Sequence, residues 1–302
     1  DWRDLTSDQV GDAIRGEMRE TGHRRVSHGL YRPATQADEM GELVLDLRAW
    51  RLVLPRGAVF THVTGARLRG WDLPRLPDYV PVFAAVRGDG PRPRRPGLLC
   101  SRLVGEQRVA FRHGLPVDSS EEILLRSARD LGELDLAVMI NSAIRCGDID
   151  DERMEALLAT RRPGVRKLRR AWTRAHGKAE SAGETVLGVF HEVCDIPVQP
   201  QVELFDDAGH LLGRADLLVV GTGLVHEYDG EHHRTGRQHA VDLRRERGLG
   251  SAYQRRGFVL DDLLNHPLTV MHELDRALGR PHRRSRMHRW RQLVADSMYD
   301  DA

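Results

Sequence analysis

The clearest hydrophobic pattern in the chain is a pair of apolar runs in its second half. Residues 211–220 and 224–229 are rich in leucine and valine, and a Gly-Thr-Gly break separates them. Gly221 and Thr222 suit a two-residue turn with glycine in its first position. We therefore predict a β-hairpin that spans both runs.

The predicted turn fixes which residues face each other across the hairpin. It places Leu218 opposite Val225 and Asp216 opposite Glu227. Because side chains alternate along a strand, Asp216 and Glu227 share one face, and Asp229 follows two residues further along it. The hairpin thus gathers three acidic side chains.

The segments around the hairpin complete a domain over residues 179–280. The periodicity predicts a helix over 184–194, a strand over 200–205, a helix over 240–256, a strand over 258–260 and a short helix over 261–264. A helix, a three-stranded meander, another helix and a final strand give an α/β/α layer arrangement with a mixed sheet.

Residues 38–158 have the pattern of a mixed α+β middle domain. We expect a helix over 42–50, a strand that runs into a helix over 58–68, and strands over 81–86 and 97–100. Two helices with good apolar periodicity follow, over 119–131 and 133–145.

The first 37 residues resemble the end of a winged helix-turn-helix. Ser7 is a plausible cap for a helix that carries Val10, Ile14 and Met18 at a spacing of four. A basic ribbon over 23–33 follows and ends at a proline. The alternative is a surface helix and hairpin without DNA contact. On the first interpretation, DNA phosphates are contacted by Arg24 and Arg25.

The overall charge is balanced, but the basic residues are locally crowded. The 302 residues include 46 basic and 45 acidic ones, so net charge indicates no partner. A connecting helix over 159–178 and a C-terminal tail over 281–302, the latter around Trp290, are arginine-rich. A run of one sign is either a solvated face or a phosphate-binding surface, and both remain open. For the connecting helix the candidate phosphate contacts are Arg166, Lys167, Arg169 and Arg170.

Composition also narrows the cellular setting. Cys100, Cys146 and Cys194 are widely spaced, which favours a reduced compartment over a disulfide framework or a cysteine zinc site. No apolar run approaches the roughly 18 residues of a membrane span, and no signal peptide is visible. We expect a soluble, cytoplasmic protein with no membrane partner.

The acidic hairpin is the strongest chemical signal. Carboxylates placed this closely repel one another unless a cation lies between them, and hard divalent ions take such oxygen ligands. We predict that Asp216 and Glu227 bind Mg²⁺ or Mn²⁺. The alternatives are exposed strand-end carboxylates, or a zinc site that uses His226, His232, His233 and His239.

In order along the chain, Glu184, Arg214-Ala215-Asp216, Glu227-Tyr228-Asp229-Gly230 and His233 resemble the restriction-endonuclease-like, or PD-(D/E)XK, superfamily. Asp242, Arg245 and Gly257-Phe258-Val259-Leu260 are similar to its very-short-patch-repair-like branch. The resemblance covers about one hundred residues, and it implies a nuclease domain.

The same resemblance implies roles for individual residues. Asp216 would bridge the metal, Glu227 would be the second carboxylate, and Glu184 would complete the metal shell or hold a ligating water. His233 would act as general base or stabilise the leaving group, and Arg234 or Arg245 would hold the scissile phosphate. The chain departs from many superfamily members at Asp229, which stands where they have lysine.

Residues 1–160 resemble the region related to AbiEi-type antitoxins, through Gly29-Leu30-Tyr31-Arg32, residues 61–70 and Gly114-Leu115-Pro116-Val117. This second resemblance implies a winged-helix start and DNA binding. Together the two imply a metal-dependent DNA endonuclease in repair, restriction or defence. The alternatives are a non-catalytic DNA-binding regulator, such as the antitoxin of a type IV toxin–antitoxin system, and an interaction partner of a cognate toxin or defence protein. The substrate, DNA or RNA, and the oligomeric state stay open.

Overall fold

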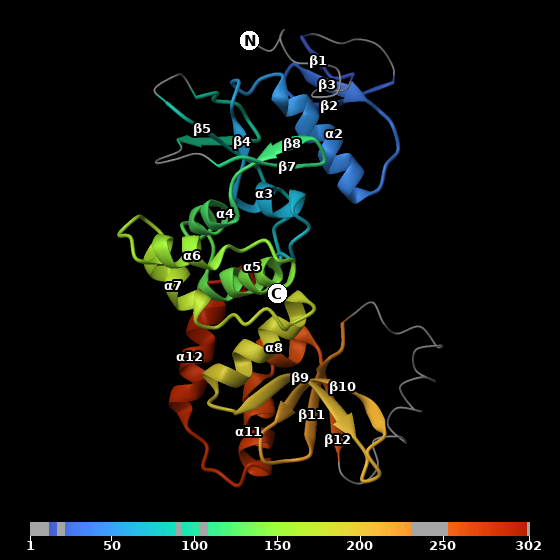
Figure 1. The fold of residues 1–302 in the computed structure, drawn as a ribbon, viewed down its shortest axis with the longest axis vertical. Helices are drawn as coiled ribbons and strands as arrows, with labels where there is room; N and C mark the ends of the chain where they lie inside the picture. The colour runs from blue at the N-terminus through green and yellow to red at the C-terminus, as the bar shows by residue number, and fades with distance from the viewer. Residues whose placement is uncertain (1–11, 17–21, 89–91, 103–107, 231–252, 301–302) are drawn as a thin grey trace.

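The computed structural model describes residues 12–16, 22–88, 92–102, 108–230 and 253–300. These residues form a mixed α+β fold with three sheets (Figure 1). No helix in these ranges is both long enough and apolar enough to cross a membrane.

The N-terminal sheet confirms the basic ribbon and corrects the helix before it. Strands β2 (His23–Ser27) and β3 (Leu30–Pro33) form the ribbon, and β1 (Ile14–Arg15) pairs with β3, which gives the order β1-β3-β2. Ile14 is therefore in a strand, and the prediction of a helix through it is wrong. Gly16 has φ +143°, a conformation that no helix accommodates. Val10 and Met18 lie outside the described residues.

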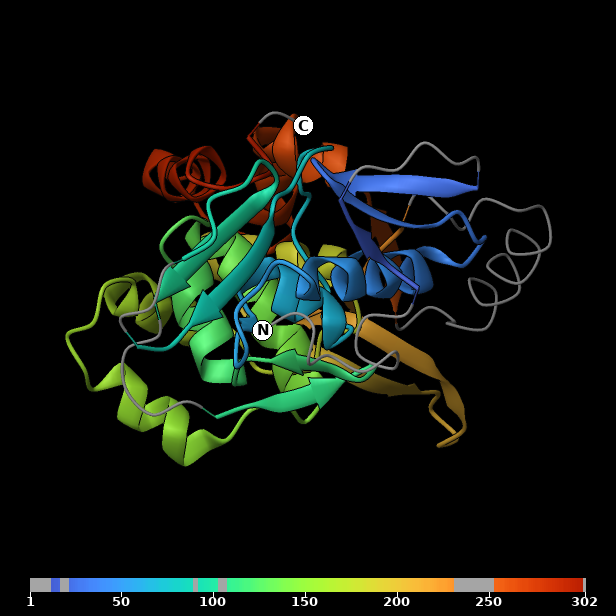
Figure 2. The ribbon, with the colours of Figure 1, turned by 90° about the horizontal axis from the view of Figure 1, so that it is seen from above.

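The middle region has the elements that the sequence predicted, with shifted ends. Helix α2 (Glu39–Arg51) contacts the N-terminal sheet, as Figure 2 shows from above. The five-stranded sheet has the order β6-β5-β4-β8-β7. Its strands and the helix between them are β4 (Val59–Phe60), α3 (His62–Leu68), β5 (Val82–Val86), β6 (Leu98–Arg102), β7 (Ala110–Arg112) and β8 (Leu115–Val117).

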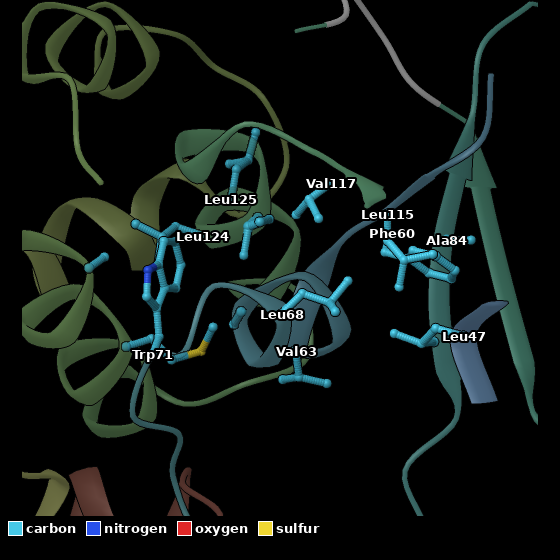
Figure 3. Packing of buried hydrophobic residues seen from close by; sticks show 14 of the residues in the cluster. Leu47, Phe60, Val63, Leu68, Trp71, Ala84, Leu115, Val117, Leu124 and Leu125 are labelled. Carbon is cyan, nitrogen blue, oxygen red and sulfur yellow. The ribbon is translucent and has the colours of Figure 1, made fainter. Parts of the chain in front are cut away.

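A layer of helices packs below this sheet. They are α4 (Ser120–Ser127), α5 (Glu133–Arg145), α6 (Asp151–Leu158) and α7 (Val165–Trp172). Figure 3 shows this core, in which Trp71 lies beside Leu124 and Phe60 lies beside Leu115 and Ala84. Gly65 of α3 allows close approach here, because a methyl group on it would lie 2.8 Å from Cδ1 of Ile123.

Helix α5 joins the two halves of the molecule. Leu136 and Met139 belong to the core of the middle region, whereas Leu134 and Val138 belong to the core of the C-terminal region. A helix that is apolar on two faces is buried between two layers. Figure 1 accordingly shows α5 between the upper sheets and the lower one.

The C-terminal region contains the predicted meander and a mixed sheet of order β12-β11-β10-β9, in which β11 and β12 run parallel. Helices α8 and α11 contribute to its core. The elements are α8 (Ala182–Val193), β9 (Val198–Phe205), β10 (Leu211–Val219), β11 (Leu224–Tyr228), β12 (Gln254–Phe258), α10 (Leu260–Leu264), α11 (Pro267–Ala277) and α12 (Arg284–Ala295).

Three predictions for the C-terminal region need correction. The helix expected over 240–256 lies mostly outside the described residues, but its last residues, 254–256, are strand. The strand expected over 258–260 ends at Phe258, and Val259 is the N-cap of α10. The segment over 281–302, expected as a tail, contains α12, whose Trp290 is fully buried and donates from Nε1 to the carbonyl oxygen of Leu263 at 2.8 Å.

Candidate functional site

The hairpin register agrees with the sequence prediction. Leu218 of β10 pairs with Val225 of β11, and the ladder ends one pair further on, before Asp216. There the backbone N–H of Tyr228 donates to Oδ2 of Asp216 at 3.0 Å. The carboxylate of Asp216 therefore serves as a hydrogen-bond acceptor where the two strands separate.

A row of residues crosses the sheet at this point. Val202 of β9 pairs with Ala215, so the preceding residue, Gln201, lies beside Asp216. Glu227 follows Asp216 on the next strand, and it pairs with Gly257 on β12. The row thus brings an amide and two carboxylates to one face of the sheet.

Glu184 reaches this row from the first turn of α8. Its backbone N–H donates to Oγ of the N-cap residue Ser181 at 3.1 Å, and that hydroxyl donates to Oε1 of Glu184 at 3.0 Å. Its other oxygen, Oε2, accepts from Nε2 of Gln201 at 3.1 Å. Glu184 therefore both caps the helix and contacts the row that contains Asp216.

Glu184 and Asp216 form the first acidic group of the site. Burial and charge raise the pKa of both carboxyl groups. For Asp216, burial is the main cause, and the nearby Glu180 adds repulsion, while hydrogen bonds from Tyr228 and Gln201 oppose the rise. For Glu184, burial again dominates, and the charge of Asp216 raises the pKa further. Each carboxylate thus makes ionisation of the other less favourable.

Gln201 lies between the two carboxylates of the first acidic group, and its own backbone conformation is unfavourable. Its φ of +54° is uncommon for a residue other than glycine. Its Oε1 is buried and accepts no hydrogen bond among the described residues. Gln201 thus combines a positive φ with a buried oxygen that has no hydrogen-bond partner among the described residues, while its amide nitrogen faces Glu184.

The second acidic group, Glu227 and Asp229, contains its own cation. Nε of Arg255 on β12 donates to Oε2 of Glu227 at 2.5 Å, and Nη2 of Arg255 lies 3.5 Å from Oδ1 of Asp229. Gly257 makes room for this arrangement, because a methyl group on it would lie 1.8 Å from Oδ2 of Asp229. The guanidinium offsets the charge of Glu227, one of the two carboxylates that the sequence paired with a metal.

The first acidic group offers the oxygen ligands that a hard divalent cation prefers. Within the described ranges, no three His, Cys, Asp or Glu side chains are grouped as a metal site. Glu184 and Asp216 supply two carboxylates, and the side-chain amide of Gln201 hydrogen-bonds both of them. Oxygen ligands of these kinds suit Mg²⁺ and Mn²⁺.

A buried histidine pair lies under the opposite face of the sheet. Nδ1 of His191 on α8 donates to the carbonyl oxygen of Leu187 at 2.7 Å, so its Nε2 accepts from Nδ1 of His226 at 2.8 Å. Burial lowers the pKa of His191 to about 4 and that of His226 to about 3. Both rings are neutral at pH 7, and His226 faces away from the acidic residues.

Most of the basic residues expected to contact phosphate make internal contacts. Lys167 donates to the carbonyl oxygen of Leu131 at 2.7 Å, and Arg170 pairs with Glu133 at 2.7 Å. Arg169 donates to the carbonyl oxygen of Leu158. These contacts involve three of the four side chains predicted to contact DNA, and Arg166 is exposed. The helix predicted over 159–178 is shorter in the structure, where α7 covers Val165–Trp172.

The two arginines of the ribbon, Arg24 and Arg25, differ in whether an acidic side chain pairs with them. Arg24 pairs with Glu42 at 2.6 Å and with Asp46 at 3.1 Å. Arg25 has no acidic partner among the described residues, and its Nη2 lies 3.2 Å from Nδ1 of His28. Both line a cavity of about 990 Å³, together with Arg94. Five arginines and two aspartates, Asp46 and Asp78, line this cavity, so a cavity with an excess of basic side chains lies beside the N-terminal sheet.

His233, Arg234 and Arg245 lie outside the described residues, so their predicted roles stay predictions. The sequence interpretation did not find Gln201 or Arg255. The chain matches no protein-family model, no curated protein and no solved structure. Only the chain's own residues therefore indicate a function.

Proposed function

We propose that this protein is a divalent-metal-dependent DNA endonuclease with a restriction-endonuclease-like C-terminal domain. The observation that carries the proposal is the convergence of Glu184, Gln201 and Asp216 where β10 and β11 separate. The carboxylates of Asp216 and Glu184 would hold Mg²⁺ or Mn²⁺. A bound ion supplies an activated water and offsets the charge of a phosphodiester.

The protein's own groups have distinct parts in this proposal. The Tyr228 N–H fixes the carboxylate of Asp216, and the hydroxyl of Ser181 fixes that of Glu184, so both are oriented before any ligand arrives. Glu227 stays the second carboxylate, and Arg255 beside it supplies positive charge toward a phosphate. His233 is proposed as the base, with Arg234 or Arg245 at the scissile phosphate.

Plasmid cleavage tests the enzyme directly. Supercoiled DNA is incubated with Mg²⁺ or Mn²⁺ and the wild type, Asp216→Ala or Glu227→Ala. Asp207→Ala is the matched control, because Asp207 is an exposed acid in the same sheet region. We expect cleavage by the wild type and the control, and a loss of at least roughly a hundredfold in both site variants. Equal cleavage by all four proteins, or none by the wild type, refutes the proposal.

A second candidate is a non-catalytic DNA-binding regulator, such as an antitoxin. The basic cavity beside the N-terminal sheet favours it, since Arg25 and Arg94 line the cavity without an acidic partner among the described residues. The strand order β1-β3-β2 also fits an abbreviated winged helix. This candidate predicts salt-sensitive DNA binding in EDTA that Arg25→Ala with Arg94→Ala weakens, and no cleavage with any metal.

A further inference from the structure

The C-terminal helices form a second hollow that the proposed nuclease function does not use. It has a volume of about 490 Å³ and lies between α11 and α12. Leu268 and His272 are four residues apart on α11, and Arg284, His288 and Arg291 follow a helical spacing on α12. The set is completed by His282 and Met287. We call this hollow the α11–α12 cleft.

Every ionisable residue that lines the cleft is basic. Among the described residues, neither Arg284 nor Arg291 forms an ion pair with an acidic side chain. Guanidinium groups without acidic partners repel one another, and an anion relieves that repulsion. The charge therefore predicts an anionic ligand.

The neighbouring hollow shows that such an excess is not general on this surface. That cavity, of about 700 Å³, is lined by residues of α5, α7, α8 and α12. Its arginines are paired, for instance Arg174 with Glu133 at 2.8 Å and Arg289 with Asp195 at 2.8 Å. The same helix, α12, thus turns Arg289 toward an acid and Arg284 and Arg291 toward the cleft.

A buried acid fixes one wall of the cleft. Asp275 is 2% exposed and accepts from Nε of Arg280 at 2.7 Å and from Nη1 of Arg286 at 3.1 Å. Its second oxygen lies 3.2 Å from Nδ1 of His282. This contact leaves Nε2 of His282 available to a ligand. The ring of His272 stands at 87° to that of His282, with centroids 4.1 Å apart, so the two rings support each other.

We propose that the α11–α12 cleft binds the phosphate groups of a nucleotide. Arg284 and Arg291 suit this role because a guanidinium donates two parallel hydrogen bonds to a phosphate. Leu268, which is 37% exposed, offers an apolar surface for the ring of the nucleotide. The volume lies within the range of about 300–1,000 Å³ that small-molecule sites occupy.

The cleft is separate from the first acidic group. Glu273 of α11 pairs with Arg256 of β12, one residue before Gly257, and side chains alternate along a strand. Helix α11 therefore packs on the face opposite Glu227 and Asp216. The proposal does not depend on the nuclease, and its test measures binding alone.

Isothermal titration calorimetry of the full chain in EDTA tests the proposal. The probes are ATP, tripolyphosphate and a short 5′-phosphorylated thymidine oligonucleotide. The test variant is Arg284→Ala with Arg291→Ala. The matched control is Arg56→Ala with Arg129→Ala, which removes two exposed arginines elsewhere. A third variant, Arg284→Lys with Arg291→Lys, keeps the positive charge but loses the two parallel hydrogen bonds that a guanidinium donates.

We expect ATP to bind the wild type and the control, and to bind the double alanine variant at least roughly tenfold more weakly. The lysine variant is expected to fall between them, and tripolyphosphate to bind more weakly than ATP because it lacks a ring. Tighter binding of the oligonucleotide than of ATP, with the same loss in the double alanine variant, supports the site and assigns it to nucleic-acid ends. No binding of any probe to the wild type, or equal losses in the test and control variants, overturns the proposal.

Discussion

Two acidic groups lie side by side on one face of the C-terminal sheet, and their charges are balanced differently. In the first group, Glu184 and Asp216 meet around the amide of Gln201, and both have a raised pKa. In the second, Arg255 pairs with Glu227 at 2.5 Å and approaches Asp229. Residues of the same type thus differ in whether the protein supplies their cation.

This difference shows at which group a bound cation would relieve more charge repulsion. A divalent ion at the first group relieves repulsion that the fold leaves in place, whereas at the second it competes with a guanidinium. The sequence placed the metal between Asp216 and Glu227. In the proposed site the metal instead lies between Asp216 and Glu184, and Glu227 is held at the edge of the site by Arg255.

The largest effect is expected at Gly183, near the start of α8, the helix that carries Glu184. A methyl group on Gly183 would lie 2.0 Å from Cε1 of Tyr228, so Gly183→Ala pushes the start of α8 away from β11. We expect a loss of about 3 kcal/mol in the free energy of unfolding, measured by urea denaturation.

Gly188 provides a matched control on the same helix. Nothing lies within 4 Å of a methyl group at this position, so Gly188→Ala is expected to stabilise the protein by about 0.5–1 kcal/mol through helix propensity. If both substitutions have the same sign, the close packing of α8 on Tyr228 is not what positions Glu184.

The second largest effect is metal binding measured without catalysis. A ligand at about 100 times its Kd adds about 2.7 kcal/mol to the free energy of unfolding. We expect Mn²⁺ to raise the melting temperature of the wild type and of Asp229→Asn, but not that of Asp216→Asn. Equal stabilisation of all three proteins would place the metal elsewhere, and a loss confined to Asp229→Asn would reverse the assignment of the two groups.

Local pattern was enough to predict the first group in part. The turn at Gly221 fixed the register that sets Asp216 opposite Glu227, and the N-terminal signals of α8 placed Glu184 in its first turn. Gln201 was not found, because nothing in its strand marks a residue with φ +54°. Its position beside Asp216 follows from pairing between strands, which is a non-local contact.

The second group and the C-terminal helix were missed for a related reason. Strand β12 reads Gln-Arg-Arg-Gly-Phe, which has no apolar alternation, and it forms only by parallel pairing with β11. Arg255 was therefore placed in a helix. Likewise Arg286 appeared to be part of a basic tail, although it is buried and pairs with Asp195, far away in the sequence.

A smaller effect is expected when the cation of the second group is removed. Arg255→Ala leaves Glu227, which is 18% exposed, beside Asp229 without the guanidinium. We expect a loss of about 1–2 kcal/mol in the free energy of unfolding, and tighter Mn²⁺ binding by calorimetry because the competing charge is gone. Arg255→Lys serves as the charge-conserving control. Unchanged metal affinity in Arg255→Ala would show that the two groups do not share a cation.

The smallest effect separates the groups by pH. Because the pKa of Asp216 and of Glu184 is raised on folding, the native state holds their protons more tightly than the unfolded chain. Their contribution to stability is therefore greatest in acid and is lost as the pH rises through the native pKa. Asp216→Asn and Glu184→Gln should each be more stable than the wild type at pH 7, measured by urea denaturation.

That gain should shrink as the pH falls, because the wild-type carboxyl groups then become neutral too. Asp206 is a control of opposite sign, since hydrogen bonds from His210 lower its pKa. Asp206→Asn should therefore lose stability at pH 7 and approach the wild type in acid. A pH-independent gain in Asp216→Asn would mean that the substitution acts through packing, and the charge repulsion assigned to the first group would then have no energetic consequence.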